Sequence, residues 1–270
     1  MAAQITAVII FLIMFALIIT EKIPRHIATT ICSIATIILV FGVCMHSATA
    51  LWDTLNFQTV TSVDFWRAGA EATESTKGIN WQTIIFIAGM MIMVEGMALS
   101  GFFSWLCLTI AKAVRYNTTK IFIMFMILAF VLSMFIDSIT VILFLAAITI
   151  TQSKLLQFDP IPVIIAEIFC SNLGGSSTMC GDPPNIIIGT ALHYTFTDFL
   201  TNTGVIAIIC LVLMIFFFYM CFRIKLGKRN LSEEEIEKMP TPQSAITNKR
   251  AFIISTVIFL CAVILLVTHG

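Results

Sequence analysis

One apolar run, from Ile121 to Ser153, constrains the fold of this chain more than any other feature of its sequence. It is interrupted only by Asp137 and nearby hydroxyl side chains. As a single helix it would be about 50 Å long, whereas the hydrocarbon core of a bilayer is about 30 Å thick. Split at Asp137, each arm is about 24 Å long, slightly short of a full crossing. These lengths favour a re-entrant hairpin over residues 121–153, with its tip at residues 137–140, over two tilted spans joined by a polar turn.

The composition of the chain is that of a membrane protein. Hydrophobic residues make up 59% of it and charged residues 11%, whereas soluble domains carry about 25% charged residues. Lipid must therefore be the solvent for much of the surface, and we expect an all-α integral membrane protein in contact with the lipid bilayer. The net charge of zero offers no basic surface for nucleic acid. The eight cysteines have no metal-ligand spacing, so we expect no cofactor.

Further apolar segments are long enough to cross a bilayer. They cover residues 3–20, 27–46, 81–100, 203–222 and 251–268. Residues 47–80 are expected to form an external loop, and residues 101–117 a helix lying in the interface. Asn80 is expected to cap the segment that follows it. In the polar stretch 223–250, the capping-box pattern at Ser232–Glu235 predicts a short surface helix.

Lysine and arginine residues predict the orientation, because cytoplasmic loops collect them. With residues 224–250 on the cytoplasmic side, thirteen of the fifteen basic residues lie inside, and only Arg67 and Lys77 lie outside. We therefore expect a multi-pass protein of the cell membrane with its N-terminus outside. A re-entrant hairpin and two full spans give the same orientation, so charge does not separate them.

A second interruption lies within residues 160–193. Asp159 and Pro160 predict a helix start, since aspartate caps helices and proline fits their first turn. That helix is expected to end near Cys170, because the glycine, proline and polar residues of Ser171–Asn185 are typical of irregular backbone. Helical character resumes afterwards, so we predict a discontinuous helix over residues 160–193.

Four acidic residues lie inside apolar segments: Glu95, Asp137, Glu167 and Asp182. A carboxylate in hydrocarbon costs at least a few kcal/mol and usually faces a cavity or an ion. Asp137 and Asp182 lie at helix breaks, so we expect both to be functional. Glu95 lies near the end of its span and is expected to reach water, whereas Glu167 is expected to pair with a hydroxyl or to stay protonated between helices.

The ends of a broken helix offer ion ligands. Free carbonyl groups near Cys170, with the oxygens of Ser171, Asn172 and Thr178, are suited to Na⁺. Free N–H groups at the helix start after Asn185 are suited to an anion. Broken helices with opposed ends near the bilayer midplane are a common binding device of secondary transporters.

Both interruptions carry a family resemblance. The stretches Phe135–Thr140, Ser171–Gly175 and Gly181–Asn185 resemble the arsenite-permease and Na⁺/H⁺-antiporter branch of the ion transporter superfamily, which includes citrate and divalent-anion symporters. The resemblance covers residues 10–225. It implies two inverted repeats, each with a re-entrant hairpin and a broken helix. It also implies secondary transport of a small inorganic or carboxylate ion such as arsenite or citrate, with Na⁺ or H⁺ as the coupling ion, or Na⁺/H⁺ antiport.

The resemblance implies one ion- and substrate-binding site at the two interruptions. Its expected residues are Asp137, Ser138, Thr140, Ser171, Asn172, Gly174, Gly175, Thr178, Gly181, Asp182, Pro183, Pro184 and Asn185. Na⁺ is expected at Ser138, Ser171 and Asn172. Family members commonly have asparagine where this chain has Ser138, which keeps an oxygen ligand and loses the amide.

The predicted organisation is one transporter repeat over residues 1–223, a cytoplasmic linker over 224–250 and the first span of a truncated second repeat over 251–270. Because a second hairpin and a second broken helix are missing, we expect the chain to work with a second half-transporter or as a homo-oligomer. The alternative is a non-transporting membrane subunit or a degenerate fragment. An intramembrane aspartyl protease is disfavoured, since its GxGD motif would need glycine at Met179, and we expect no enzyme.

Overall fold

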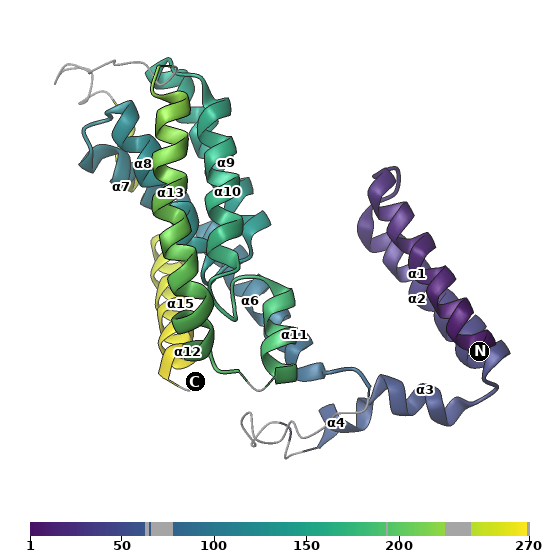
Figure 1. The fold of residues 1–270 in the computed structure, drawn as a ribbon. Helices are drawn as coiled ribbons and strands as arrows, with labels where there is room; N and C mark the ends of the chain where they lie inside the picture. Colours follow the sequence, from purple (N-terminus) through teal and green to yellow (C-terminus); the bar gives the residue numbers. More distant parts are fainter. Residues whose placement is uncertain (63–64, 66–77, 193, 225–238, 269–270) are drawn as a thin grey trace. The chain divides into compact units, whose positions relative to one another are not determined.

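The computed structural model describes residues 1–62, 65, 78–192, 194–224 and 239–268, and these residues form helices joined by turns (Figure 1). Six helices in the described part are long and apolar enough to cross a membrane. The chain is therefore a multi-pass, all-α membrane protein. Its contacts divide it into two units, Met1–Ile84 and Ile85–Gly270, which are described separately.

The first unit begins with a helical hairpin. α1 (Ala2–Thr20) packs against α2 (Arg25–Thr36), which continues into the π-helical segment η1 (Ile37–Cys44). The two predicted spans at residues 3–20 and 27–46 are confirmed as helices. The interior of this hairpin is small and consists of Ile10, Cys32 and Val40. Most other apolar side chains of these helices are exposed, as is expected of surfaces that face lipid.

Two short helices, α3 (Ala48–Leu55) and α4 (Phe57–Thr61), lie in the predicted external loop. The indole Nε1 of Trp81 donates to the carbonyl oxygen of Leu55 at 2.7 Å, and its ring stacks on Phe57 with 5.0 Å between centroids. These contacts fasten the two short helices to the start of α6 (Trp81–Ser100). Asn80 Oδ1 accepts from Thr83 N at 3.2 Å, which confirms the predicted cap.

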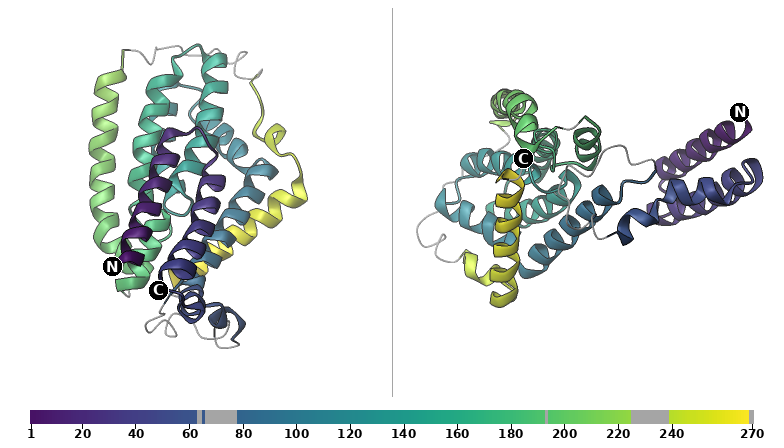
Figure 2. Two further views of the ribbon diagram at one scale, coloured as in Figure 1. Left: turned by 90° about the vertical axis from the view of Figure 1, so that its right-hand side faces the viewer. Right: turned by 90° about the horizontal axis from the view of Figure 1, so that it is seen from below.

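The second unit contains the remaining helices. In chain order these are the rest of α6, α7 (Phe102–Ala113), α8 (Thr118–Ser133), α9 (Ser138–Leu156), α10 (Pro160–Gly175), α11 (Pro183–Leu192), α12 (Phe196–Phe199), η3 (Leu200–Gly204), α13 (Val205–Phe222), η4 (Pro242–Ala245) and α15 (Lys249–Thr268). α10 packs along α8, α9 and α13. Figure 1 shows α9, α10 and α13 side by side, and Figure 2 shows α15 inclined to them.

α8 and α9 form an antiparallel hairpin around the interruption at Asp137. α10 starts a few residues after α9 ends, so these two helices run in opposite directions. The last residue of α8, Ser133, lies beside Ser171 near the far end of α10, so α8 runs with α10 and against α9. At 16 and 19 residues, α8 and α9 are about 24 and 28 Å long. The predicted break is confirmed, and the depth of the hairpin in the membrane stays a prediction.

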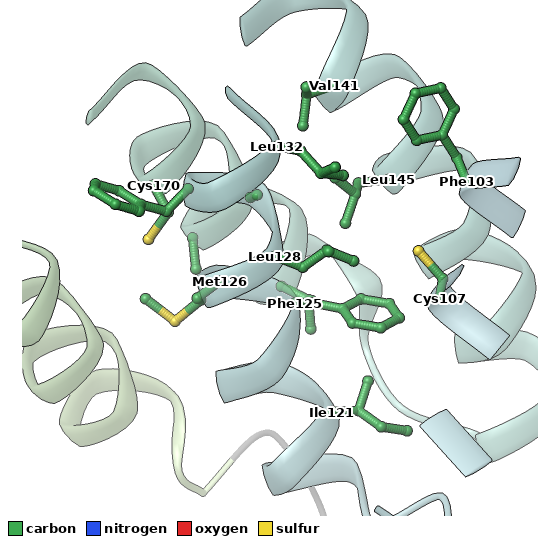
Figure 3. Close-up of a cluster of buried hydrophobic side chains, with 14 of the residues drawn as sticks. Phe103, Cys107, Ile121, Phe125, Met126, Leu128, Leu132, Val141, Leu145 and Cys170 are labelled. Carbon is green, nitrogen blue, oxygen red and sulfur yellow. The ribbon is translucent and has the colours of Figure 1, made fainter. Parts of the chain in front are cut away.

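The main hydrophobic core lies between α7, α8, α9 and α10, as Figure 3 shows for Phe103, Cys107, Phe125 and Leu145. α7 buries Phe103, Cys107 and Ala111, which are spaced four residues apart and share one helix face. The ring of Phe103 stacks on Phe144 of α9 with 4.9 Å between centroids. The segment predicted to lie in the interface is thus a helix with one face in the core. Its position relative to the membrane stays a prediction.

Two boundaries near the C-terminal part of the chain differ from expectation. The span predicted to begin at residue 203 begins at Phe196, because Thr195 and Asp198 form a capping box. In this box Asp198 N donates to Thr195 Oγ1 at 3.2 Å, and Thr195 N donates to Asp198 Oδ2 at 2.9 Å. The predicted linker 224–250 ends early, since α15 begins at Lys249. The helix predicted at Ser232–Glu235 lies outside the described residues.

Candidate functional site

The break between α10 and α11 is shorter than predicted. α10 continues to Gly175 and α11 begins at Pro183, so only residues 176–182 are irregular. The expectation that Ser171–Gly175 is not helical was wrong, because Gly174 packs against α8 and Ser171 bonds to Ser133 and Ser138 of the hairpin. Pro183 and Pro184 belong to α11, since the first turn of a helix does not need their missing N–H groups.

Glycines at the break allow backbone to pack directly on backbone. A Cβ atom on Gly174 would overlap the carbonyl group of Phe130 in α8. A Cβ atom on Gly181 would lie 2.6 Å from the carbonyl oxygen of Ser133. A Cβ atom on Gly175 would lie 2.7 Å from Cγ of Asp182. Only glycine therefore permits this close approach of the break to α8 and of the carboxylate to α10.

Asp182 and Asp137 both lie at the N-terminus of α9. Asp182 Oδ1 accepts from Ser138 Oγ at 2.9 Å and from Ser138 N at 3.4 Å. Asp137 Oδ2 accepts from Thr140 N at 3.0 Å, and its Oδ1 accepts from Thr140 Oγ1 at 2.6 Å. Two carboxyl groups are thus placed where one helix end supplies about half a positive charge.

The hydroxyls of Ser133 and Ser171 and the carbonyl group of Ser138 link the α8–α9 hairpin to α10. Ser133 Oγ and Ser171 Oγ share a hydrogen bond of 2.5 Å, and Ser171 Oγ donates to the carbonyl oxygen of Ser138 at 3.1 Å. All three serines are buried. The sequence reasoning missed Ser133, although an isolated hydroxyl four residues before Asp137 in an apolar run was a signal that could have found it.

Thr178 and Asn185 hold the two sides of the break together. Thr178 Oγ1 donates to the carbonyl oxygen of Met134 in the hairpin turn and accepts from Gly181 N at 3.1 Å. Asn185 Nδ2 donates to the carbonyl oxygens of Gly175 and Thr178, both at 2.9 Å. The free carbonyl groups were predicted near Cys170, but α10 ends at Gly175, and the Gly175 carbonyl oxygen at this end already accepts a hydrogen bond from the protein.

The predicted Na⁺ ligands are only partly brought together. Ser138 and Ser171 are adjacent, but Asn172 is exposed and its Nδ2 donates to the carbonyl oxygen of Ile168 on its own helix. The helix period explains the difference, because consecutive residues of a helix point about 100° apart. Asn172 therefore faces away from the buried serines.

The predicted anion site at the start of α11 has few donors. Pro183 and Pro184 are exposed and have no N–H groups, and Asn185 N already donates to the carbonyl oxygen of Asp182 at 3.0 Å. The helix start was predicted after Asn185, but α11 begins three residues earlier, at Pro183, and its first three positions offer no free N–H group.

The two other membrane acids differ in their surroundings. Glu95 is exposed on α6. Glu167 has no exposed surface, and its Oε1 accepts from Thr149 Oγ1 at 2.6 Å. The expectation that Glu167 pairs with a hydroxyl is confirmed.

Comparisons with known proteins agree with this architecture. The sequence model of a citrate transporter family matches residues 15–270. An uncharacterized transporter of Mycobacterium tuberculosis is 33% identical over 138 residues, which are 51% of this chain and 32% of that protein. The P protein of Homo sapiens is 36% identical over 148 residues, which are 54% of this chain and 18% of that protein. The chain thus matches less than a third of the length of either relative.

Proposed function

The chain belongs to the citrate transporter family, and from this premise we propose that it forms part of a secondary active transporter that moves a small anion together with Na⁺ or H⁺. The single observation that carries the proposal is the pair of carboxylates, Asp137 and Asp182, at the N-terminus of α9. Both belong to helix breaks of the kind that secondary transporters use for binding.

The coupling cation binds at Asp182 and Ser138 in this proposal. Each Asp182 oxygen has more than one lone pair, and the described contacts with Ser138 engage Oδ1 alone. Ser138 Oγ is also an oxygen ligand, suited to a hard cation such as Na⁺. Asp137 contributes its negative charge while it caps α9 through Thr140. A bound Na⁺ or H⁺ would offset the excess negative charge of the site.

The anion binds at the exposed edge of the same break. Asn172 of α10 and Pro183 and Pro184 of α11 are exposed at this break. Because the prolines have no N–H groups, the bound cation supplies the main attraction for the anion in this proposal. Without a bound cation the neighbouring carboxylates repel an anion, so cation binding comes first and anion binding second. This order couples the two ions. The exposed edge is also where a second half-transporter or a second copy would complete the site.

An uptake assay tests this function. Vesicles that contain the full chain, alone or co-produced with the polypeptide encoded next to it, receive an inward Na⁺ or H⁺ gradient and labelled citrate. We expect gradient-driven uptake that is lost in a variant with both Asp137→Ala and Asp182→Ala. Asp159→Asn is a matched control, because Asp159 is an exposed cap on the other end of α10 and asparagine also caps helices. Uptake that survives the double substitution would overturn the proposed site, and no uptake from either preparation would favour a non-transporting subunit.

A further inference from the structure

A second polar cluster lies inside the helical bundle, away from the hairpin turn. It comprises the contacting pair Thr149 of α9 and Glu167 of α10, and Gln152, which lies three residues after Thr149 on the same face of α9; none of the three is more than 2% exposed. Thr149 Oγ1 donates to Glu167 Oε1 at 2.6 Å. Among the described residues, Glu167 Oε2 and both amide atoms of Gln152 have no hydrogen-bond partner. Buried polar atoms are nearly always hydrogen-bonded, so these three atoms need an explanation.

No cation compensates a charge on Glu167 in the described structure. The titratable groups that could interact with the charge on Glu167 lie on α7 and on the helices that pack along α10. They are Cys107 and Lys112 on α7, Lys120 on α8, Lys154 on α9, and Cys210, Tyr219 and Cys221 on α13. Of these, the Cys107 thiol interacts electrostatically with Glu167, as does the thiol of Cys170 on α10 itself (Figure 3 shows both cysteines). The three lysines are exposed. An ionised carboxylate in such surroundings costs several kcal/mol, so the cluster suits the neutral acid.

The cluster is connected to the candidate cation site along α10. Glu167 precedes Ser171 by four residues, so the two side chains lie on the same helix face, one turn apart. The Ser171 hydroxyl donates to the Ser138 carbonyl oxygen, and the Ser138 hydroxyl donates to Asp182. Buried polar side chains on α9 and α10 are therefore present from the level of Gln152 and Glu167 to the two helix breaks.

We propose that Glu167 is a reversible proton-binding site of this transporter, with Gln152 and Thr149 as its positioning residues. This role deepens the proposed function and rests on it. In the protonated state the O–H group at Oε2 donates to Oε1 of Gln152. When the proton leaves to bulk water, the carboxylate accepts from Nε2 of Gln152 instead, after a rotation of the amide. Thr149 donates to Oε1 of Glu167 in both states. The Gln152 amide and the Thr149 hydroxyl can therefore hydrogen-bond both the protonated and the ionised form of Glu167, and neither group carries a charge.

Infrared spectroscopy of the full chain in lipid vesicles tests the proposal without any need for transport. We expect a carbonyl band of a protonated, buried carboxylic acid, which gives way reversibly to carboxylate bands as the pH is raised. Glu167→Gln removes this band, whereas Glu95→Gln, which changes an exposed membrane glutamate, leaves it. Isotope labelling of all glutamates in the unsubstituted chain shifts the band, so the assignment to glutamate does not depend on the folding of a variant. A band that is absent, insensitive to pH, or retained in Glu167→Gln would overturn the proposal.

Uptake measurements separate this inference from the proposed function. If the unsubstituted chain takes up citrate, we expect Glu167→Gln to lose most of the pH dependence of uptake, and retention of the full pH dependence would contradict a role in coupling. If the unsubstituted chain shows the titrating band and no uptake, proton binding stands and the transport function fails. A purely structural role of Glu167 would lower stability and leave the pH profile of the remaining uptake unchanged.

Discussion

The Ser138 hydroxyl donates to Oδ1 of Asp182 at 2.9 Å and so joins the turn of the α8–α9 hairpin to the break between α10 and α11. The two residues are 44 positions apart in the chain. This pair of side chains therefore forms only where the two breaks meet. A movement of one break would change the geometry of the other, which would couple the two ions of the proposed function.

Asp182→Asn tests the charge at this link. Ser138 Oγ and Ser138 N can still donate to the amide oxygen, so we expect the fold to persist. Hydrogen bonds to charged groups contribute about 1.5–3 kcal/mol, so we expect the apparent cation affinity to fall by about tenfold or more. The measurement is the Na⁺ or H⁺ concentration that gives half-maximal uptake, with Asp159→Asn as the control. An unchanged value would remove Asp182 from the cation site.

Ser171→Ala tests the buried hydroxyl link. The substitution removes the hydrogen bonds to Ser133 and to the Ser138 carbonyl group and leaves both buried groups without this partner. We expect a loss of about 1–3 kcal/mol in stability, measured as a lower midpoint of thermal unfolding in detergent. Ser176→Ala is the matched control, because Ser176 is exposed and bonds only within its own turn, to Leu173. Equal midpoints for the two variants would contradict the structural role of Ser171.

Gly174→Ala tests the close contact between α10 and α8. The added methyl group would overlap the Phe130 carbonyl group, and backbone must move to admit it. Overpacking of this kind costs about 1–3 kcal/mol or more, so we expect a lower yield of monodisperse protein and a lower unfolding midpoint.

Gly89→Ala provides the control for this steric effect. A Cβ atom on Gly89 of α6 meets nothing within 4 Å, and alanine has the higher helix propensity. We expect this variant to be as stable as the unsubstituted chain or more so. Equal unfolding midpoints for Gly174→Ala and Gly89→Ala would contradict the view that the close backbone contact requires glycine at position 174.

Ile139→Cys distinguishes a re-entrant hairpin from two full spans. Ile139 lies in the first turn of α9, and its side chain is 61% exposed. If the turn stays within the bilayer, a membrane-impermeant maleimide added outside should label this cysteine much more slowly than a cysteine at Thr49, in the predicted external loop. The experiment uses a chain without its native cysteines. Equally fast labelling at both positions would show that the turn reaches the outer surface.

The sequence predicted where the helices are interrupted better than it predicted how long each interruption is. The break at Asp137 was identified from the length of its apolar run, and Asp159 was identified as a helix cap from residue type. Both side chains accept hydrogen bonds from backbone N–H groups of the helices that follow. Ser171–Gly175 was misassigned because glycine and serine are poor helix formers on their own. Their helical state depends on packing against α8, which a local pattern does not contain.

The sequence by itself determined that this chain is an all-α membrane protein with interruptions near Asp137 and Asp182, because hydrophobic length and local cap chemistry depend on neighbours along the chain. Only the tertiary structure decided which polar groups meet. It brought Ser133, Ser138 and Ser171 together, placed both aspartates at one helix N-terminus, and turned Asn172 outward. The physical reason is that the rotation and packing of helices set these contacts, and both depend on residues that are far apart in the sequence.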